Sequence, residues 1–162
     1  MKMMQKKIRS LIYAGLGLIL CVLLCGGIGM TAQAAKEKTY NGFTYEDQGY
    51  GIVITGYKGS KTELVIPEKI AGKKVVRIGC RAFENCIDLV SITIPEGVTT
   101  IDMYAFSYCK KLSSITLPEN LTKIETCAFE GCKSLTGITL PESLTNIGIW
   151  AFASCDSLTN IT

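Results

Sequence analysis

Residues 112–134 read LSSITLPENLTKIETCAFEGCKS, and close copies of these 23 residues begin at Leu89 and Leu135. A unit this short cannot bury its own apolar side chains, so tandem copies are stable only when they stack on one another. The period therefore predicts a solenoid of successive coils. Its function has to be sought on the surface, because the interior is used for stacking.

Each copy repeats the same order of structural signals. The segment LSSITLP is rich in β-branched residues and ends at Pro118, which predicts a short parallel strand. A second apolar pair follows, Leu121 and Ile124, and then Ala128 and Phe129 open what we expect to be a short helical or 3₁₀ turn. The predicted fold class is α/β and β-rich, with short parallel strands and short helical turns.

Stacking at one coil spacing, about 4.8 Å, would place like residues in columns. The predicted coils are 62–88, 89–111, 112–134 and 135–157, with a partial coil at 158–162. One column contains Phe83, Phe106, Phe129 and Phe152, and another contains Cys86, Cys109, Cys132 and Cys155. The first coil is five residues longer than the others, and the extra length, within Lys69–Lys74, is expected to form a loop.

Residues 35–61 precede the coils and form a predicted N-terminal cap. Within this segment, residues 42–46 and 51–57 alternate apolar with polar or small residues, which predicts a β-hairpin across 47–50. Such a hairpin would cover the apolar end of the first coil, and solenoids need such a lid for solubility.

Residues 1–34 have the layout of a secretory signal peptide. Basic residues come first, then an apolar run over 11–30, then a small-residue cleavage motif that ends at Ala34. An uncleaved membrane anchor is an alternative, because the apolar run is about long enough to span a bilayer. A lipoprotein signal ending at Cys25 is another, although the preceding Leu24 is larger than the residue usual before a lipidated cysteine. We therefore expect an exported protein, secreted or on the cell surface, that touches a membrane only through this segment.

Composition excludes two broad classes of function. The formal charge of +3 depends on four basic residues within the first nine, without which 13 basic residues face 14 acidic ones. A near-neutral chain lacks the clustered positive field that nucleic-acid binding requires. The sequence also has no histidine and no GxSxG nucleophile motif, so we expect a noncatalytic protein.

The repeated patterns LxxIxLP, LxxI and AFxxC resemble the leucine-rich repeat proteins of the BspA-like type, also called the Treponema pallidum type. The resemblance begins at about Tyr40 and includes the lead-in ITGY at 54–57 and IAGK at 70–73. It implies a right-handed solenoid of bacterial character, secreted or displayed on the cell surface, that binds proteins, host matrix or other cells. It implies no catalytic residues.

The outward positions of the predicted strands are the candidate binding residues. Their side chains are small, polar and uncharged, and such a surface is easily desolvated in part, as protein recognition requires. They are Ser91, Thr93, Ser114, Thr116, Thr139 and Asn160. The preference of threonine for exposed strands explains the same pattern without a function. A regular threonine row is also a feature of ice-binding solenoids.

Three aromatic residues stand at positions that vary between the copies. These are Tyr104, Tyr108 and Trp150. Aromatic side chains outside the repeat pattern can anchor an interface. The alternative is that they pack over the rim of the coils.

Two further columns consist of residues that can bind metal ions or form disulfides, but we expect no cofactor and no metal. The cysteine column lacks the CxxC spacing of metal sites, and its side chains would lie farther apart than a disulfide prefers, so we interpret it as small buried filler. A glutamate column follows the turn prolines, at Glu68, Glu96, Glu119 and Glu142. It could offer oxygen ligands to calcium, but we expect a solvated acidic edge.

The sequence thus predicts a noncatalytic leucine-rich repeat protein that mediates protein–protein contacts or adhesion to a host or cell. The expected partner is a protein or a macromolecule of the host matrix or cell surface. The alternative is a structural, self-assembling surface protein, or a fragment of a larger one. Its last coil would then stack end to end, because an uncovered coil presents unpaired strand edges.

Overall fold

The structure, a computed structural model, describes residues 37–162. The predicted signal segment, 1–34, lies outside the described residues. No helix within residues 37–162 could cross a membrane.

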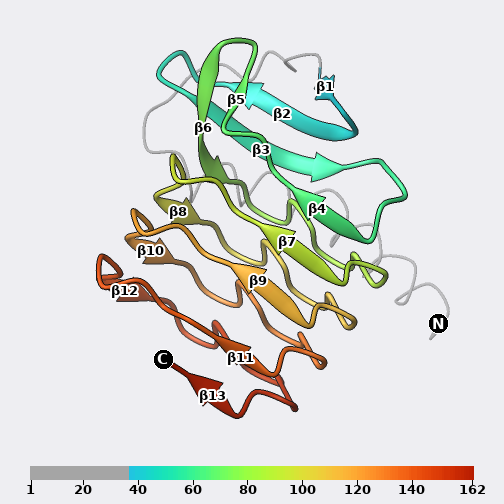
Figure 1. The fold of residues 1–162 in the computed structure, drawn as a ribbon, viewed down its shortest axis with the longest axis vertical. Helices are drawn as coiled ribbons and strands as arrows, with labels where there is room; N and C mark the ends of the chain where they lie inside the picture. Colours follow the sequence, from blue (N-terminus) through green and yellow to red (C-terminus); the bar gives the residue numbers. More distant parts are fainter. Residues whose placement is uncertain (1–36) are drawn as a thin grey trace, which may run out of the picture. The chain divides into compact units, whose positions relative to one another are not determined.

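Each coil contributes two short strands, which build two ladders of parallel strands (Figure 1). The first ladder contains β4 (Glu63–Val65), β7 (Ser91–Thr93), β9 (Ser114–Thr116), β11 (Gly137–Ile138) and β13 (Asn160–Ile161). The second contains β6 (Lys73–Ile78), β8 (Thr100–Ile101), β10 (Lys123–Ile124) and β12 (Asn146–Ile147). Ile92 lies opposite Ile115, and Ile101 opposite Ile124, so residues 23 apart occupy equivalent positions in adjacent regular coils. Between β4 and β7 the offset is 28, as Leu64 opposite Ile92 shows, because of the five extra residues of the first coil. The predicted solenoid of short parallel strands is confirmed.

The N-terminal cap extends the second ladder. It consists of β1 (Lys38–Tyr40), β2 (Phe43–Asp47) and β3 (Ile52–Tyr57), with β2 and β3 paired antiparallel as a hairpin. β3 then pairs in parallel with β6, and Ile52 and Ile54 on β3 are fully buried. The cap therefore covers the apolar end of the first coil and also joins its backbone to the solenoid.

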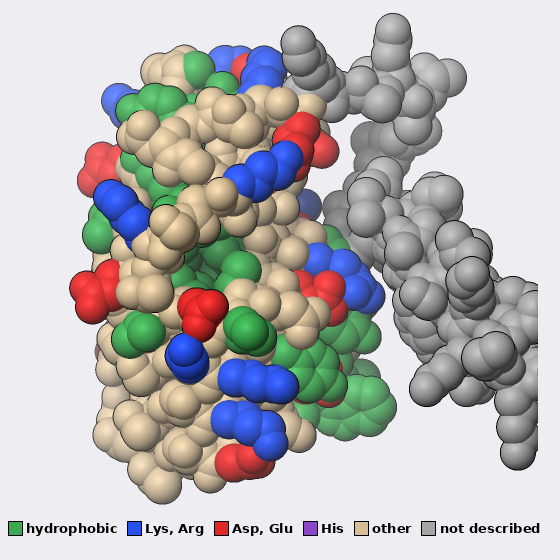
Figure 2. Space-filling model, turned by 90° about the vertical axis from the view of Figure 1, so that its right-hand side faces the viewer, with side chains coloured by type: hydrophobic (Ala, Val, Ile, Leu, Met, Phe, Trp, Pro, Cys, Tyr) green, Lys and Arg blue, Asp and Glu red, His purple; other side chains and the backbone are tan. Residues whose placement is uncertain are grey.

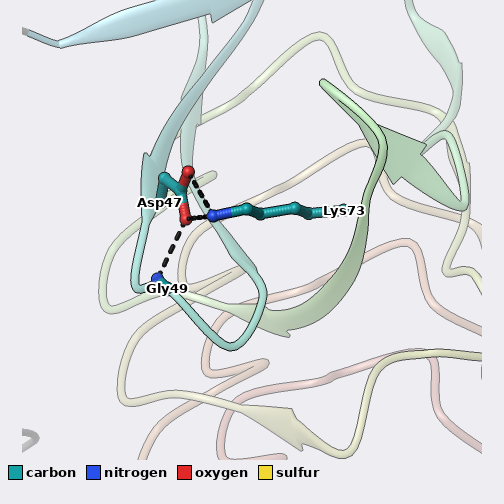
Figure 3. A network of polar contacts seen from close by, with 3 residues as sticks. All are labelled: Asp47, Gly49 and Lys73. Atoms are coloured by element: carbon teal, nitrogen blue, oxygen red, sulfur yellow. Dashed lines mark hydrogen bonds and ion pairs between the residues drawn. The ribbon is translucent and has the colours of Figure 1, made fainter.

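The extra length of the first coil forms a hairpin where we expected a loop. β5 (Lys69–Ile70) pairs antiparallel with the start of β6. Between them, Ala71 and Gly72 have φ of 51° and 79°, as the tight two-residue turns of hairpins require. The Asp47 carboxylate accepts hydrogen bonds from Lys73 Nζ, 2.8 Å from both oxygens, and from Gly49 N at 2.9 Å (Figure 3). This network links the insertion to the turn of the cap.

The phenylalanine column runs through the core as one file of stacked rings. The ring centroids of Phe83 and Phe106 lie 5.1 Å apart, those of Phe106 and Phe129 5.2 Å, and those of Phe129 and Phe152 5.3 Å. Adjacent planes differ by 4° or less. Phe83, Phe106 and Phe129 are fully buried, so the predicted vertical stacking is confirmed.

The prediction of short helical or 3₁₀ turns after the second strand is wrong, because residues 37–162 contain no helix. Each coil instead closes through an arc of turns in which two residues have a positive φ, for example Tyr104 at 58° and Tyr108 at 59°. Such residues interrupt the right-handed φ/ψ values that a helix repeats. The amide N–H groups between the turns point to the next coil, as in Phe83 N to Ala105 O at 2.7 Å. Hydrogen bonds between adjacent coils therefore take the place of helical hydrogen bonds along the arc.

The cysteine column donates hydrogen bonds as well as filling space. Cys109 Sγ lies 3.0 Å from the carbonyl oxygen of Phe83, and Cys132 Sγ lies 3.2 Å from that of Phe106. Both cysteines are fully buried free thiols. The neighbouring Cys86 thiol and burial together raise the pKa of Cys109, so this thiol is a poor nucleophile. The sequence interpretation as buried filler is confirmed for these two, but it missed the hydrogen bonds.

Candidate functional site

The first ladder presents two columns of outward side chains. One column contains Glu63, Ser91, Ser114, Gly137 and Asn160, and the other contains Val65, Thr93, Thr116, Thr139 and Thr162. Alternation along a strand sends these residues to the side opposite the buried Leu64 and Ile92. The structure thus brings together on one face all six residues that the sequence analysis selected. We call these two columns the sheet face.

Hydroxyl groups on and beside the sheet face differ in their hydrogen bonding. Beside the face, hydroxyls are used by the fold: Ser113 Oγ donates to Val90 O at 3.2 Å, and Thr159 Oγ1 donates to Thr136 O at 3.4 Å. On the face, no side-chain hydrogen bond within the described residues engages the hydroxyls of Ser91, Thr93, Ser114 or Thr116. Thr139 and Thr162 bond each other at 3.2 Å. The face therefore offers donors and acceptors that the fold does not use.

The first ladder is interrupted between β9 and β11. β7 and β9 are flanked by the backbone bonds Ser113 N to Val90 O and Ile94 N to Thr116 O, at 2.9 and 3.0 Å. The equivalent bonds between β9 and β11 are missing in the described chain, and the two strands belong to separate sheets. Gly137 stands on β11 where the two preceding strands carry serine, and glycine weakens a strand. The second ladder continues unbroken from β10 to β12.

Two shallow hollows lie along this interruption. The smaller, of about 240 Å³, is lined by Ser113, Ser114, Ile115, Thr136, Gly137, Ile138, Thr139, Asn160 and Thr162. The larger, of about 480 Å³, is lined by Ile115, Thr116, Leu117, Glu119, Thr139, Leu140, Pro141 and Glu142. Both hollows share Ile115 and Thr139. We call the pair the β9–β11 groove. The sequence analysis did not predict it, and Gly137 in place of serine was the signal available.

The three variable aromatic residues lie on the arc, away from the sheet face. Tyr104 is covered by the Arg81 guanidinium, 4.7 Å from its ring centroid, and Tyr108 donates to Glu130 Oε1 at 3.2 Å. Trp150 is 71% exposed. Figure 2 shows hydrophobic side chains gathered along the border of the lower half of one face, beside lysine and acidic side chains. The two tyrosines are thus engaged within the fold, whereas Trp150 is open to contact.

The glutamate column lies exposed at the ends of the first-ladder strands. Glu96 Oε2 accepts a hydrogen bond from Glu119 N at 3.1 Å, which links two coils. No ion pair within residues 37–162 engages Glu68, Glu96, Glu119 or Glu142. Among the described residues, no group of three or more His, Cys, Asp or Glu side chains is placed to hold a metal ion.

Asp102 is a buried carboxylate that the sequence analysis missed. It is 4% exposed, and its Oδ1 lies 3.7 Å from Arg77 Nε. Burial raises the pKa of Asp102 to about 6, while the Arg77 charge acts in the opposite direction. The available signal was an acidic residue directly after the inward Ile101, a position that holds Gly79 and Gly148 in two other coils and Glu125 in the third.

Inward leucines and isoleucines at a 23-residue interval, two stacked strands per coil and a closing arc define a leucine-rich repeat solenoid. Residues 57–162 match the model of the BspA type leucine-rich repeat region in six copies. The chain belongs to this family, which confirms the resemblance found in the sequence. Proteins of this family are generally noncatalytic and typically mediate protein interactions.

Solved structures of related proteins share the fold. The leucine-rich repeat protein TpLRR of T. pallidum is 33% identical with a TM-score of 0.67, over 78% of this chain and 71% of that one. A leucine-rich repeat protein of Bacteroides capillosus is 27% identical with a TM-score of 0.69, over 77% and 96%. The pneumococcal vaccine antigen PcpA is 25% identical with a TM-score of 0.62, over 78% of this chain but 38% of its own. No match was found among curated proteins.

Proposed function

We propose that this protein acts outside the cell as an adhesion or recognition protein that binds other proteins through its sheet face. The supporting observation is the contrast between hydroxyls: those of Ser113 and Thr159, beside the face, bond the backbone, whereas those of Ser91, Thr93, Ser114 and Thr116 do not. Unused polar groups on a rigid, weakly charged surface can pair with a partner at a small desolvation cost. Export is supported by the layout of residues 1–34 and by the relation to a pneumococcal vaccine antigen.

The expected partners are proteins of the host matrix or of other cell surfaces. Mature protein immobilised on a sensor surface would be exposed to purified matrix proteins and to bacterial cell-wall extracts. The test compares the native chain with the double variant Thr116→Lys/Thr139→Lys, which places two cations on the sheet face. Both threonines are exposed, so the variant should keep its melting temperature while it loses partner binding. Unchanged partner binding by the folded variant would exclude the sheet face.

Self-assembly is the alternative function, and a dilution series separates it from binding to a different protein. Light scattering of the mature chain should give one monomeric mass from micromolar to millimolar concentrations. A mass that rises with concentration, together with no partner capture, would favour the structural role.

A further inference from the structure

The β9–β11 groove exposes part of the core that is closed elsewhere in the ladder. Ile92 and Ile94, on the β7 side, are each 2% exposed. The equivalent residues on the β9 side, Ile115 and Leu117, are only half-buried, although another coil follows them. The apolar floor of the larger hollow is therefore accessible from the sheet face.

The groove is too narrow to accept another strand between β9 and β11. Cα atoms of the two strands lie within 8 Å of each other, whereas two flanking strands with a third between them are about 9.6 Å apart. A ligand must therefore lie over the groove and insert side chains into it. The lining runs from Ser113 to Leu117, which is about 16 Å of extended chain. That length suits an extended peptide of four or five residues better than a compact small molecule.

The two ends of the groove differ in charge. The end lined by Ser114, Thr136 and Asn160 is polar and uncharged. The opposite end carries the carboxylates of Glu119 and Glu142, which have no ion-pair partner within residues 37–162. A ligand with a positive charge at this end would gain two unneutralised carboxylates as partners.

We propose that the β9–β11 groove binds an extended protein segment in which aliphatic side chains are followed by lysine or arginine. The aliphatic side chains contact Ile115 and Leu117, and the cation reaches Glu119 and Glu142. The proposal rests on the proposed function, because it names the kind of segment that the sheet face recognises.

The test uses a fluorescein-labelled peptide, Gly-Ser-Leu-Thr-Leu-Lys-Lys, and a counterpart in which glutamates replace the two lysines. Fluorescence anisotropy should show binding of the lysine peptide that is about tenfold tighter than that of the glutamate peptide and that weakens with added salt. Glu119→Gln/Glu142→Gln should weaken binding of the lysine peptide about fivefold to tenfold. Glu68→Gln is the matched control, since Glu68 belongs to the same column but does not line the groove. It should leave the affinity within about twofold.

Equal affinity for both peptides, an equal loss in Glu68→Gln, or no binding of the lysine peptide at millimolar concentration would overturn the proposal. Ser91→Lys/Thr93→Lys distinguishes this failure from failure of the sheet face, because these residues lie on the face but outside the groove. If that variant loses partner capture while the lysine peptide does not bind, the sheet face is functional and the groove is not its binding site.

Discussion

The thiols of Cys109, Cys132 and Cys155 share one kind of partner, the carbonyl of the phenylalanine one coil earlier. In Cys132 this bond, to Phe106 O, is 3.2 Å long within a fully buried environment. Filling a small space and donating to a buried carbonyl are separate contributions, and cysteine makes both. This combination accounts for a thiol in a column where alanine would also fit the space.

Replacing Cys109 by alanine should therefore destabilise the fold by about 1–2 kcal/mol, through a lost hydrogen bond and a small cavity. The free energy of unfolding would be measured in urea. Ser113→Ala is the control, since its hydroxyl also donates to a backbone carbonyl but is exposed, and it should cost less than about 0.5 kcal/mol. Equal losses in the two variants would contradict the assigned role of burial.

Asp102 should make the stability depend on pH. Its folded-state pKa of about 6 lies above the ordinary value of 3.8, so the folded chain holds this proton more tightly than the unfolded chain. The resulting stabilisation is complete below about pH 4 and is lost as the pH rises through about 6. Asp102→Asn removes this dependence, so its stability relative to the native chain should rise by up to about 3 kcal/mol between pH 4 and pH 7.

Urea unfolding at several pH values measures this difference. Asp88→Asn is the matched control, because Asp88 is exposed and pairs with Lys111 Nζ at 2.7 Å. Native and Asp102→Asn curves that run parallel across the whole range would show that Asp102 does not titrate in this window.

At the scale of elements, the phenylalanine column is the part of the core that runs without a break through all four coils. Phe106 is covered by rings on both sides, whereas Phe152 has a ring on one side and is only half-buried. Phe106→Ala should cost about 3–5 kcal/mol in unfolding free energy, and Phe152→Ala clearly less. Urea denaturation of both variants tests this order, and a larger loss in Phe152→Ala would argue against the file as the main source of stability.

The arc explains why glycine is tolerated at one of its positions. Ser154 has φ of 55°, and the same column contains Gly131 with φ of 71°. A left-handed conformation costs a non-glycine residue about 1–2 kcal/mol. Glycine avoids this cost, but it loses more conformational entropy on folding, which offsets part of the gain. Ser154→Gly should therefore raise the unfolding free energy by about 0.5–1 kcal/mol.

Ser157 supplies the comparison within the same coil, since it is exposed and lacks a positive φ. Ser157→Gly should lower the unfolding free energy by about 0.5 kcal/mol. Thermal or urea unfolding that shows the same sign for both serine variants would contradict the role given to the arc geometry.

At the scale of the whole molecule, the cap and the coils share one continuous sheet from β1 to β12. A perturbation in the cap should therefore reach the last coils.

Ile54→Ala, at a fully buried cap position, should lower the stability by about 2–5 kcal/mol. The single tryptophan, Trp150, reports the opposite end of the solenoid by fluorescence, and its midpoint should fall together with the far-UV circular dichroism midpoint. Val65→Ala, at a 72% exposed site, should change neither midpoint. Separate midpoints in Ile54→Ala would indicate that the cap and the last coils unfold independently.

The stacking of the coils could be predicted from the amino-acid sequence, because a repeated apolar pattern can be buried in only one arrangement. The alignment of Phe83 with Phe106, the pairing of Ile92 with Ile115 and the placement of Thr93 beside Thr116 all follow from one 23-residue offset. The selection of a hydroxyl-rich face required no more than this offset and the alternation of side chains along a strand.

Features that depend on backbone geometry and local packing could be seen only in the folded chain. Tyr104 and Cys127 adopt positive φ although neither is glycine or asparagine, so propensity predicted a helix where the stack imposes turns. The opening beside Ile115 and the burial of Asp102 depend on how adjacent coils fit, which a regular repeat does not encode. A periodic sequence specifies which residues of adjacent coils stack on one another. Irregular features, such as the groove and the buried Asp102, arise from the summed contacts of the folded chain.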